Sequence, residues 1–178
     1  AEFGASLDCI LDGGDCEVGL ESTIVACLGG RVTLLRPGSI SRSQVEDVVG
    51  RVEAPGADAP RAPGSDRAHY APGTPLAIVP AAGLQVAVEA ALSRGERVAV
   101  LARSAPFAEP ARVAWRRMPQ APAAYGKALY AALRALDASG ADRILAESVP
   151  GDEPWAAVAD RLSRAAGAGG PDDALSGP

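Results

Sequence analysis

The chain has 178 residues, of which 48% are hydrophobic and 4% are aromatic, and its formal net charge is -5. This length accommodates one domain, or one small domain with part of another. The acidic balance gives no electrostatic case for direct nucleic-acid binding. Three cysteines without a C-x-x-C pair, and a single histidine, argue against a disulfide framework and against a metal site built from these residues.

The given sequence shows no feature that points to secretion. No charged-then-apolar leader opens it, and no apolar run approaches the ~20 residues that span a bilayer. We therefore expect a cytoplasmic protein without a membrane partner. Residues 1–4 read like the end of a helix and include no initiator methionine, so we also expect a fragment or a trimmed chain.

Residues 1–52 carry strand and turn signals. Two β-prone runs, residues 22–28 and 31–35, are separated only by Gly29 and Gly30. Glycine tolerates the positive φ that tight hairpin turns need, so this pattern predicts a β-hairpin.

A short helix is predicted directly after this hairpin. Ser41 and Gln44 have the spacing of a capping box, valines follow at helical spacing, and Gly50 marks the helix end. One hairpin and one short helix bury too little to be stable alone. We therefore expect residues 1–52 to depend on a partner element.

Residues 53–75 are predicted to be a linker, because five prolines and three glycines at this density do not build helices or central strands. From residue 76 onward, strands and helices alternate. Strands are expected at residues 76–79, 98–102, 113–118 and 144–146.

The helices between these strands are defined by their apolar stripes. The expected buried faces are Leu84, Val88, Ala91 and Leu92; then Tyr125, Leu129, Ala132, Leu133 and Leu136; then, after Asp152, Trp155, Val158, Ala159 and Leu162. This order predicts an α/β domain over residues 76–166, with a mostly parallel sheet and helices on both faces. Residues 167–178 are expected to be a disordered tail.

Three polar side chains of the first region are candidate ligand contacts. Ser22 and Thr23 place two hydroxyls at a strand start after a glycine turn, where they could hold a carboxylate or phosphate. The alternative is an ordinary strand start. Arg36 ends a strand in a turn, where a guanidinium can bind phosphate in two-pronged fashion, or form a surface salt bridge.

His69 and Tyr70 lie in the linker and offer a ring to stack on a base and a donor for a phosphate or ribose. The alternative is a contact that pins the linker to a domain, and both can hold together. Residues 80–83 contain one glycine, so the first strand-to-helix turn of the C-terminal region has no glycine-rich phosphate loop.

In their order, the motifs of the chain resemble a known family. DGG (residues 12–14), VGLESTIV (18–25) and LRPGSI (35–40) resemble the C-terminal third of a YrdC-like domain. APG (62–64) and HYAP (69–72) resemble the linker of the long, two-domain form of threonylcarbamoyl-AMP synthase. YGKALYAALRALD (125–137), ILAESVP (144–150) and DRLSRA (160–165) resemble its C-terminal domain. The resemblance covers residues 1–166.

The resemblance implies a function and a set of site residues. In this family, L-threonine and bicarbonate form a carbamate that attacks the α-phosphate of ATP, with a divalent cation such as Mg²⁺ assisting. Partner proteins then transfer the product to adenosine 37 of tRNA. Ser22 would contact threonine with Thr23 beside it, and Arg36 would contact ATP phosphate. His69 and Tyr70 would close the site, and the C-terminal domain would be Rossmann-like without a nucleotide of its own.

The chain also departs from the family pattern. The family's lysine- and arginine-bearing substrate loop and its Ser-Ala-Asn segment have no counterpart here, so no catalytic residue or Mg²⁺ ligand is identified and no catalysis by this chain alone is expected. Residues 151–155 read GDEPW where the family has a Gly-Leu-Gly-like turn.

Three alternatives to the synthase stay open. The first is a non-catalytic accessory or binding fragment of that enzyme. The second is another YrdC-like carbamoyltransferase, against which the linker and the helix at residues 125–137 argue. The third is an unrelated nucleotide-binding Rossmann protein, which the missing glycine loop disfavours.

Overall fold

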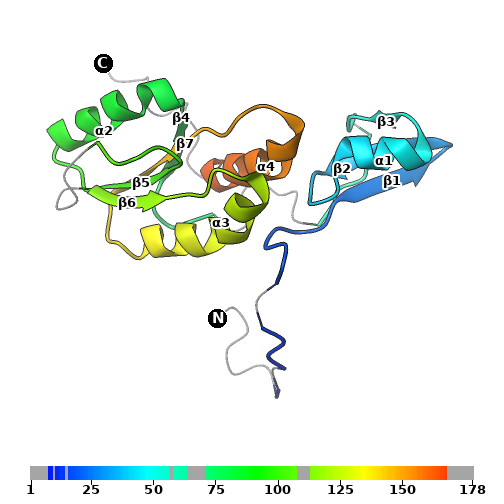
Figure 1. Cartoon of the computed structure of the whole chain (residues 1–178), viewed down its shortest axis with the longest axis horizontal. Helices are drawn as coiled ribbons and strands as arrows, with labels where there is room; N and C mark the ends of the chain where they lie inside the picture. Colours follow the sequence, from blue (N-terminus) through cyan, green and yellow to red (C-terminus); the bar gives the residue numbers. More distant parts are fainter. Residues whose placement is uncertain are drawn as a thin grey trace.

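The computed structural model describes residues 8–9, 11–14, 16–56, 58–63, 71–107 and 113–167, and these form two separate β-sheets (Figure 1). The first unit comprises β1 (Ile24–Leu28), β2 (Arg31–Arg36), α1 (Arg42–Val49) and β3 (Val52–Glu53). The second comprises β4 (Leu76–Val79), α2 (Leu84–Ser93), β5 (Val98–Ala102), β6 (Val113–Arg117), α3 (Pro122–Asp137), β7 (Arg143–Glu147) and α4 (Ala156–Ala166). Single-turn 3-10 helices, η2 (Ala81–Gly83) and η3 (Glu153–Trp155), precede α2 and α4.

The hairpin predicted around Gly29 and Gly30 is confirmed. Strands β1 and β2 pair antiparallel, and the two turn glycines have φ of 58° and 74°. Two successive positive φ values are those of a two-residue hairpin turn, which glycine adopts without steric cost. Strand β3 then pairs parallel with β2. Its two residues carry too little pattern to be predicted.

The predicted start of α1 is also confirmed. The Ser41 hydroxyl accepts the Gln44 backbone N–H, and the Gln44 side chain accepts the Ser41 backbone N–H, which completes a capping box. No residue of this helix is buried, and Val48 is 83% exposed. The first unit therefore adds little to a core, and both large hydrophobic clusters of the described residues are built on the four-stranded sheet.

The four-stranded sheet is parallel throughout, as the alternating pattern predicted. Its strand order is β4-β7-β5-β6, so the last strand of the chain is inserted between the first two. On one face, Ala99 and Leu101 pack in a cluster with residues of α3 and α4. On the other face, Val98 and Val100 pack with α2. Figure 1 shows α2 and α3 on opposite sides of the sheet.

The apolar stripe predicted for α3 is buried at all five positions. In the last helical segment, Trp155, Val158 and Leu162 are buried as expected, whereas Ala159 is only half-buried. Arg161 is buried as well, which the apolar pattern could not predict because arginine is seldom inside. Among the described residues, no helix has the length and apolarity needed to cross a membrane.

Two valines of α2 provide a matched test of this packing. Val88 is 0% exposed and Val86 is 68% exposed. Val88→Ala removes two buried methyl groups and should lower the free energy of unfolding by about 2 kcal/mol. Val86→Ala should change it by less than about 0.5 kcal/mol. Denaturant unfolding of both variants measures the difference, and equal effects would contradict the placement of α2.

Candidate functional site

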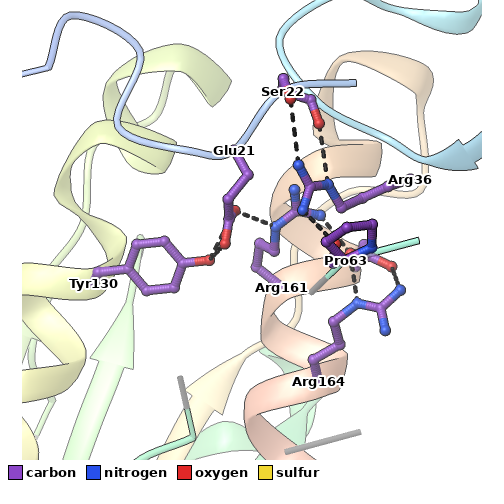
Figure 2. Close-up of polar contacts among 8 residues, drawn as sticks. Glu21, Ser22, Arg36, Pro63, Tyr130, Arg161 and Arg164 are labelled. Atoms are coloured by element: carbon purple, nitrogen blue, oxygen red, sulfur yellow. Dashed lines mark hydrogen bonds and ion pairs between the residues drawn. The ribbon is translucent and has the colours of Figure 1, made fainter. Parts of the chain in front are cut away.

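The hairpin brings Ser22 and Arg36 together. Because β1 and β2 run antiparallel, Ile24 at the start of β1 pairs with Arg36 at the end of β2. The Arg36 guanidinium donates through Nε to the Ser22 carbonyl oxygen at 3.1 Å and through Nη2 to the Ser22 hydroxyl at 3.3 Å (Figure 2). Two residues singled out separately in the sequence therefore share one contact.

A third bond connects Arg36 with the linker. Its Nη1 donates to the carbonyl oxygen of Pro63 at 2.6 Å, and the residue as a whole is only 7% exposed. A guanidinium has five N–H donors, and its three bonds within the described residues all go to neutral oxygens. Its positive charge has no carboxylate partner there, so Arg36 is equipped to attract an anion.

Thr23 has a different role from Ser22 in the described structure. Its hydroxyl donates to the Ile40 carbonyl oxygen at 2.7 Å and accepts the Ile40 backbone N–H at 3.2 Å. These bonds join the start of β1 to the chain that follows β2. They place the Ser22–Thr23 segment against the turn at residues 37–40.

Gly38 makes that close approach possible. A Cβ at this position would lie 2.2 Å from the Thr23 nitrogen and 2.5 Å from the Ser22 carbonyl carbon. Backbone atoms cannot give way as a flexible side chain can, so residue 38 has to be glycine in this arrangement. The sequence includes Gly38 in the LRPGSI motif but does not reveal this contact.

His69 and Tyr70 lie outside the described residues, and their expected contact with the nucleotide stays a prediction. The segments on either side are held. Pro63 accepts the bond from Arg36. The Asp137 carboxylate, at the end of α3, accepts the backbone N–H groups of Gly73 at 3.1 Å and Thr74 at 2.8 Å.

Sequence reasoning missed a polar cluster adjacent to Ser22. The Glu21 carboxylate accepts the Tyr130 hydroxyl at 2.9 Å and the Arg161 Nε–H at 2.6 Å (Figure 2). Each of the three residues lies in a motif that resembles the family, but no local signal pairs them, because Glu21 and Arg161 are 140 residues apart. The contact joins the segment that precedes β1 to both α3 and α4.

The environment of this cluster determines its charge states. Burial by itself raises the pKa of Glu21, but hydrogen bonds from Arg161 and Tyr130 outweigh it and bring the pKa below its usual 4.5. Burial and the neighbouring Glu21 carboxylate both raise the pKa of Tyr130. At neutral pH, Glu21 is therefore an anion and Tyr130 a neutral donor. An open groove of about 570 Å³ borders both residues and gives solvent access to one side.

The described residues hold no group of three or more His, Cys, Asp or Glu side chains placed to bind a metal ion. The described residues therefore do not fit a metal site built from such a cluster. The chemistry available at Ser22 and Arg36 is hydrogen bonding and anion attraction.

The comparisons with known proteins agree with the resemblance in the sequence. The family described as "Threonylcarbamoyl-AMP synthase, C-terminal domain" matches residues 40–167. The chain is 35% identical over 169 residues to a threonylcarbamoyl-AMP synthase of Bacillus subtilis. The matched region covers 89% of this chain and 48% of that relative. It is 29% identical to the protein of that name from Pyrococcus abyssi, covering 93% of this chain and 51% of the relative.

Solved structures show the same relationship. A crystal structure of P. abyssi Sua5 complexed with L-threonine matches with a TM-score of 0.79 at 29% identity, over 93% of this chain and 51% of that one. A P. abyssi Sua5 variant with a histidine and the next residue, a tyrosine, both replaced by alanine matches with a TM-score of 0.77 at 27% identity, over 89% of this chain and 48% of that one. The chain thus spans about half the length of the relatives that it matches. It belongs to the threonylcarbamoyl-AMP synthase C-terminal domain family.

Proposed function

We propose that this chain is the C-terminal part of an enzyme that makes threonylcarbamoyl-AMP and pyrophosphate from L-threonine, bicarbonate and ATP. The product would serve partner proteins that modify adenosine 37 of tRNA. The family match and the named relatives support this function. The observation that carries it is the buried Arg36, which lies against the Ser22 hydroxyl without a carboxylate partner among the described residues.

Ser22 and Arg36 would each contact one of the substrates. The Ser22 hydroxyl would contact L-threonine, with Thr23 supporting it through the bonds to Ile40. The Arg36 guanidinium would contact ATP phosphate. The P. abyssi relative that covers 93% of this chain was crystallised with L-threonine, which supports a threonine site in this kind of protein.

The reaction itself requires positioning and charge neutralisation more than covalent help from the protein. The threonine amine and bicarbonate form a carbamate with loss of water. A carbamate oxygen then attacks the α-phosphorus of ATP, and the bond to pyrophosphate breaks. Arg36 would neutralise part of the phosphate charge by supplying one fixed positive charge near the Ser22 hydroxyl.

His69 and Tyr70 would close this site over the nucleotide. His69 is six positions after Pro63. An extended chain spans ~3.3–3.6 Å per residue, so His69 can reach no further than roughly 20 Å from Pro63, which accepts the Arg36 bond. The double alanine variant of P. abyssi Sua5 replaces an adjacent histidine and tyrosine. In this chain the only histidine is followed by a tyrosine.

The principal rival is a non-catalytic accessory fragment, and titration separates the two. This chain should be titrated with ATP, with and without L-threonine and bicarbonate, by isothermal calorimetry. We expect measurable ATP binding that threonine strengthens, because Ser22 and Arg36 are already in contact. Absence of binding to this chain, together with product formation by the complete enzyme, would assign an accessory role to the described residues.

Replacing Arg36 tests its role in nucleotide binding. In the complete enzyme, Arg36→Ala should weaken ATP binding by ~1.5–3 kcal/mol, which is typical of a charge-assisted contact. That corresponds to roughly 10- to 150-fold in Kd. Arg31→Ala is the matched control, since Arg31 is exposed and pairs only loosely with Glu53 at 3.8 Å. Unchanged ATP affinity in Arg36→Ala would refute the role of Arg36.

A second variant tests the backbone arrangement at Ser22. Gly38→Ala places a Cβ against the backbone of residues 22 and 23 and should displace both. Gly56→Ala is the control, because nothing lies within 4 Å of its added Cβ. We expect Gly38→Ala to reduce L-threonine affinity by at least about tenfold, corresponding to ~1.4 kcal/mol, and Gly56→Ala to leave it unchanged. Equal threonine affinity in both variants would argue against this geometry.

A further inference from the structure

The residues that precede Ser22 are held by the second unit. Gly19 has φ of +77°, and a Cβ on it would lie 2.4 Å from the Lys127 Cα of α3. A Cβ on Gly126, also in α3, would lie 2.9 Å from the Leu20 Cδ1 atom. Leu20 itself packs against the cluster formed by α3, α4 and the sheet. This segment and α3 therefore approach each other at van der Waals distance.

Glu21 adds polar interactions to this contact. Its carboxylate accepts hydrogen bonds from Tyr130 of α3 and Arg161 of α4. The Arg161 side chain is 3% exposed and the Glu21 side chain is 24% exposed. Removing one partner of a buried ion pair is strongly destabilising, so Arg161 depends on the Glu21 carboxylate as well as on Asp160.

The rest of the cluster increases that dependence. Asp160 is the other anion beside Arg161, but it is shared with Arg164. The Arg161 Nη2 atom is buried and has no partner among the described residues. Loss of Glu21 would therefore leave Arg161 with one shared carboxylate, which makes separation of the segment from α4 costly.

These contacts bear on the proposed threonine site because Glu21 is directly followed by Ser22. Figure 2 shows Glu21 directed at Tyr130 and Arg161 while Ser22 faces Arg36. Ser22 is thus fixed from one side by its own hairpin and from the other by the second unit. A further contact, from the Ser43 backbone N–H to the Glu153 carboxylate at 2.7 Å, holds the two units together elsewhere.

We propose that Tyr130 and Arg161 are positioning residues that hold Glu21 and thereby set the Ser22 hydroxyl for L-threonine. The second unit then serves the reaction by placing a substrate contact, without itself touching substrate. This inference rests on the function proposed above, and it assigns to the accessory unit a role in threonine binding.

Steady-state kinetics of the complete enzyme test the inference. In Arg161→Met, KM for L-threonine should rise about tenfold, while kcat at saturating threonine and KM for ATP change by less than about threefold. Arg161→Lys keeps the charge and should recover part of the loss. Tyr130→Phe removes one hydroxyl and should raise KM for L-threonine about threefold, as for one hydrogen bond.

The controls separate positioning from general destabilisation. Tyr125 lies on the same helix as Tyr130, and its buried hydroxyl has no partner among the described residues. The KM of Tyr125→Phe for L-threonine should therefore equal that of the wild type. Arg143→Met breaks the ion pair with Glu96 and should not change KM for L-threonine either. Hydrogen exchange should be faster at the amides of residues 20–24 in Arg161→Met but not in Arg143→Met.

The outcomes distinguish this inference from the function on which it depends. An active wild-type enzyme with unchanged KM for L-threonine in both Arg161→Met and Tyr130→Phe would overturn the positioning role alone. A complete wild-type enzyme that forms no threonylcarbamoyl-AMP would overturn the proposed function, and the inference with it. A rise in KM restricted to threonine, partly reversed in Arg161→Lys, supports both.

Discussion

A buried guanidinium must find its hydrogen-bond partners inside the protein, and two arginines impose this condition here. Arg161 pairs with Glu21, which lies 140 residues earlier in the chain. Arg36 donates hydrogen bonds to the Ser22 carbonyl oxygen, the Ser22 hydroxyl and the Pro63 carbonyl oxygen. Because Glu21 and Ser22 are adjacent, the two arginines hold one short segment from two sides.

This constraint matters because the first unit has little core of its own. Its helix α1 has no buried residue, and the large hydrophobic clusters of the described residues belong to the four-stranded sheet. Specific polar contacts and close backbone approaches, such as those of Gly19 and Gly38, therefore largely decide where the segment lies. An arrangement of this kind can be disturbed by single substitutions far from any substrate.

Under the proposed function, the arrangement separates substrate contact from positioning. Arg36 and Ser22 are the groups proposed to meet substrate. The four-stranded unit contacts Glu21 through Tyr130 of α3 and Arg161 of α4, and both helices pack on its parallel sheet. Under the proposed positioning role, this unit would influence threonine binding without a nucleotide site, so the missing glycine-rich loop after β4 is compatible with that role.

The sequence by itself determined the features that depend on neighbouring residues. The Gly29–Gly30 hairpin, the Ser41 capping box, strands β4 and β5 and the buried stripe of α3 were predicted because each requires only local backbone preference or periodicity. The resemblance to the family pointed to Ser22, Thr23, Arg36, His69 and Tyr70, and the substrate contacts of all five remain predictions. Tertiary structure alone decided the strand order β4-β7-β5-β6, the burial of Arg161 and its pairing with Glu21. These depend on contacts between residues far apart in the chain, and no local pattern specifies which charged residue will be buried or which partner it will meet.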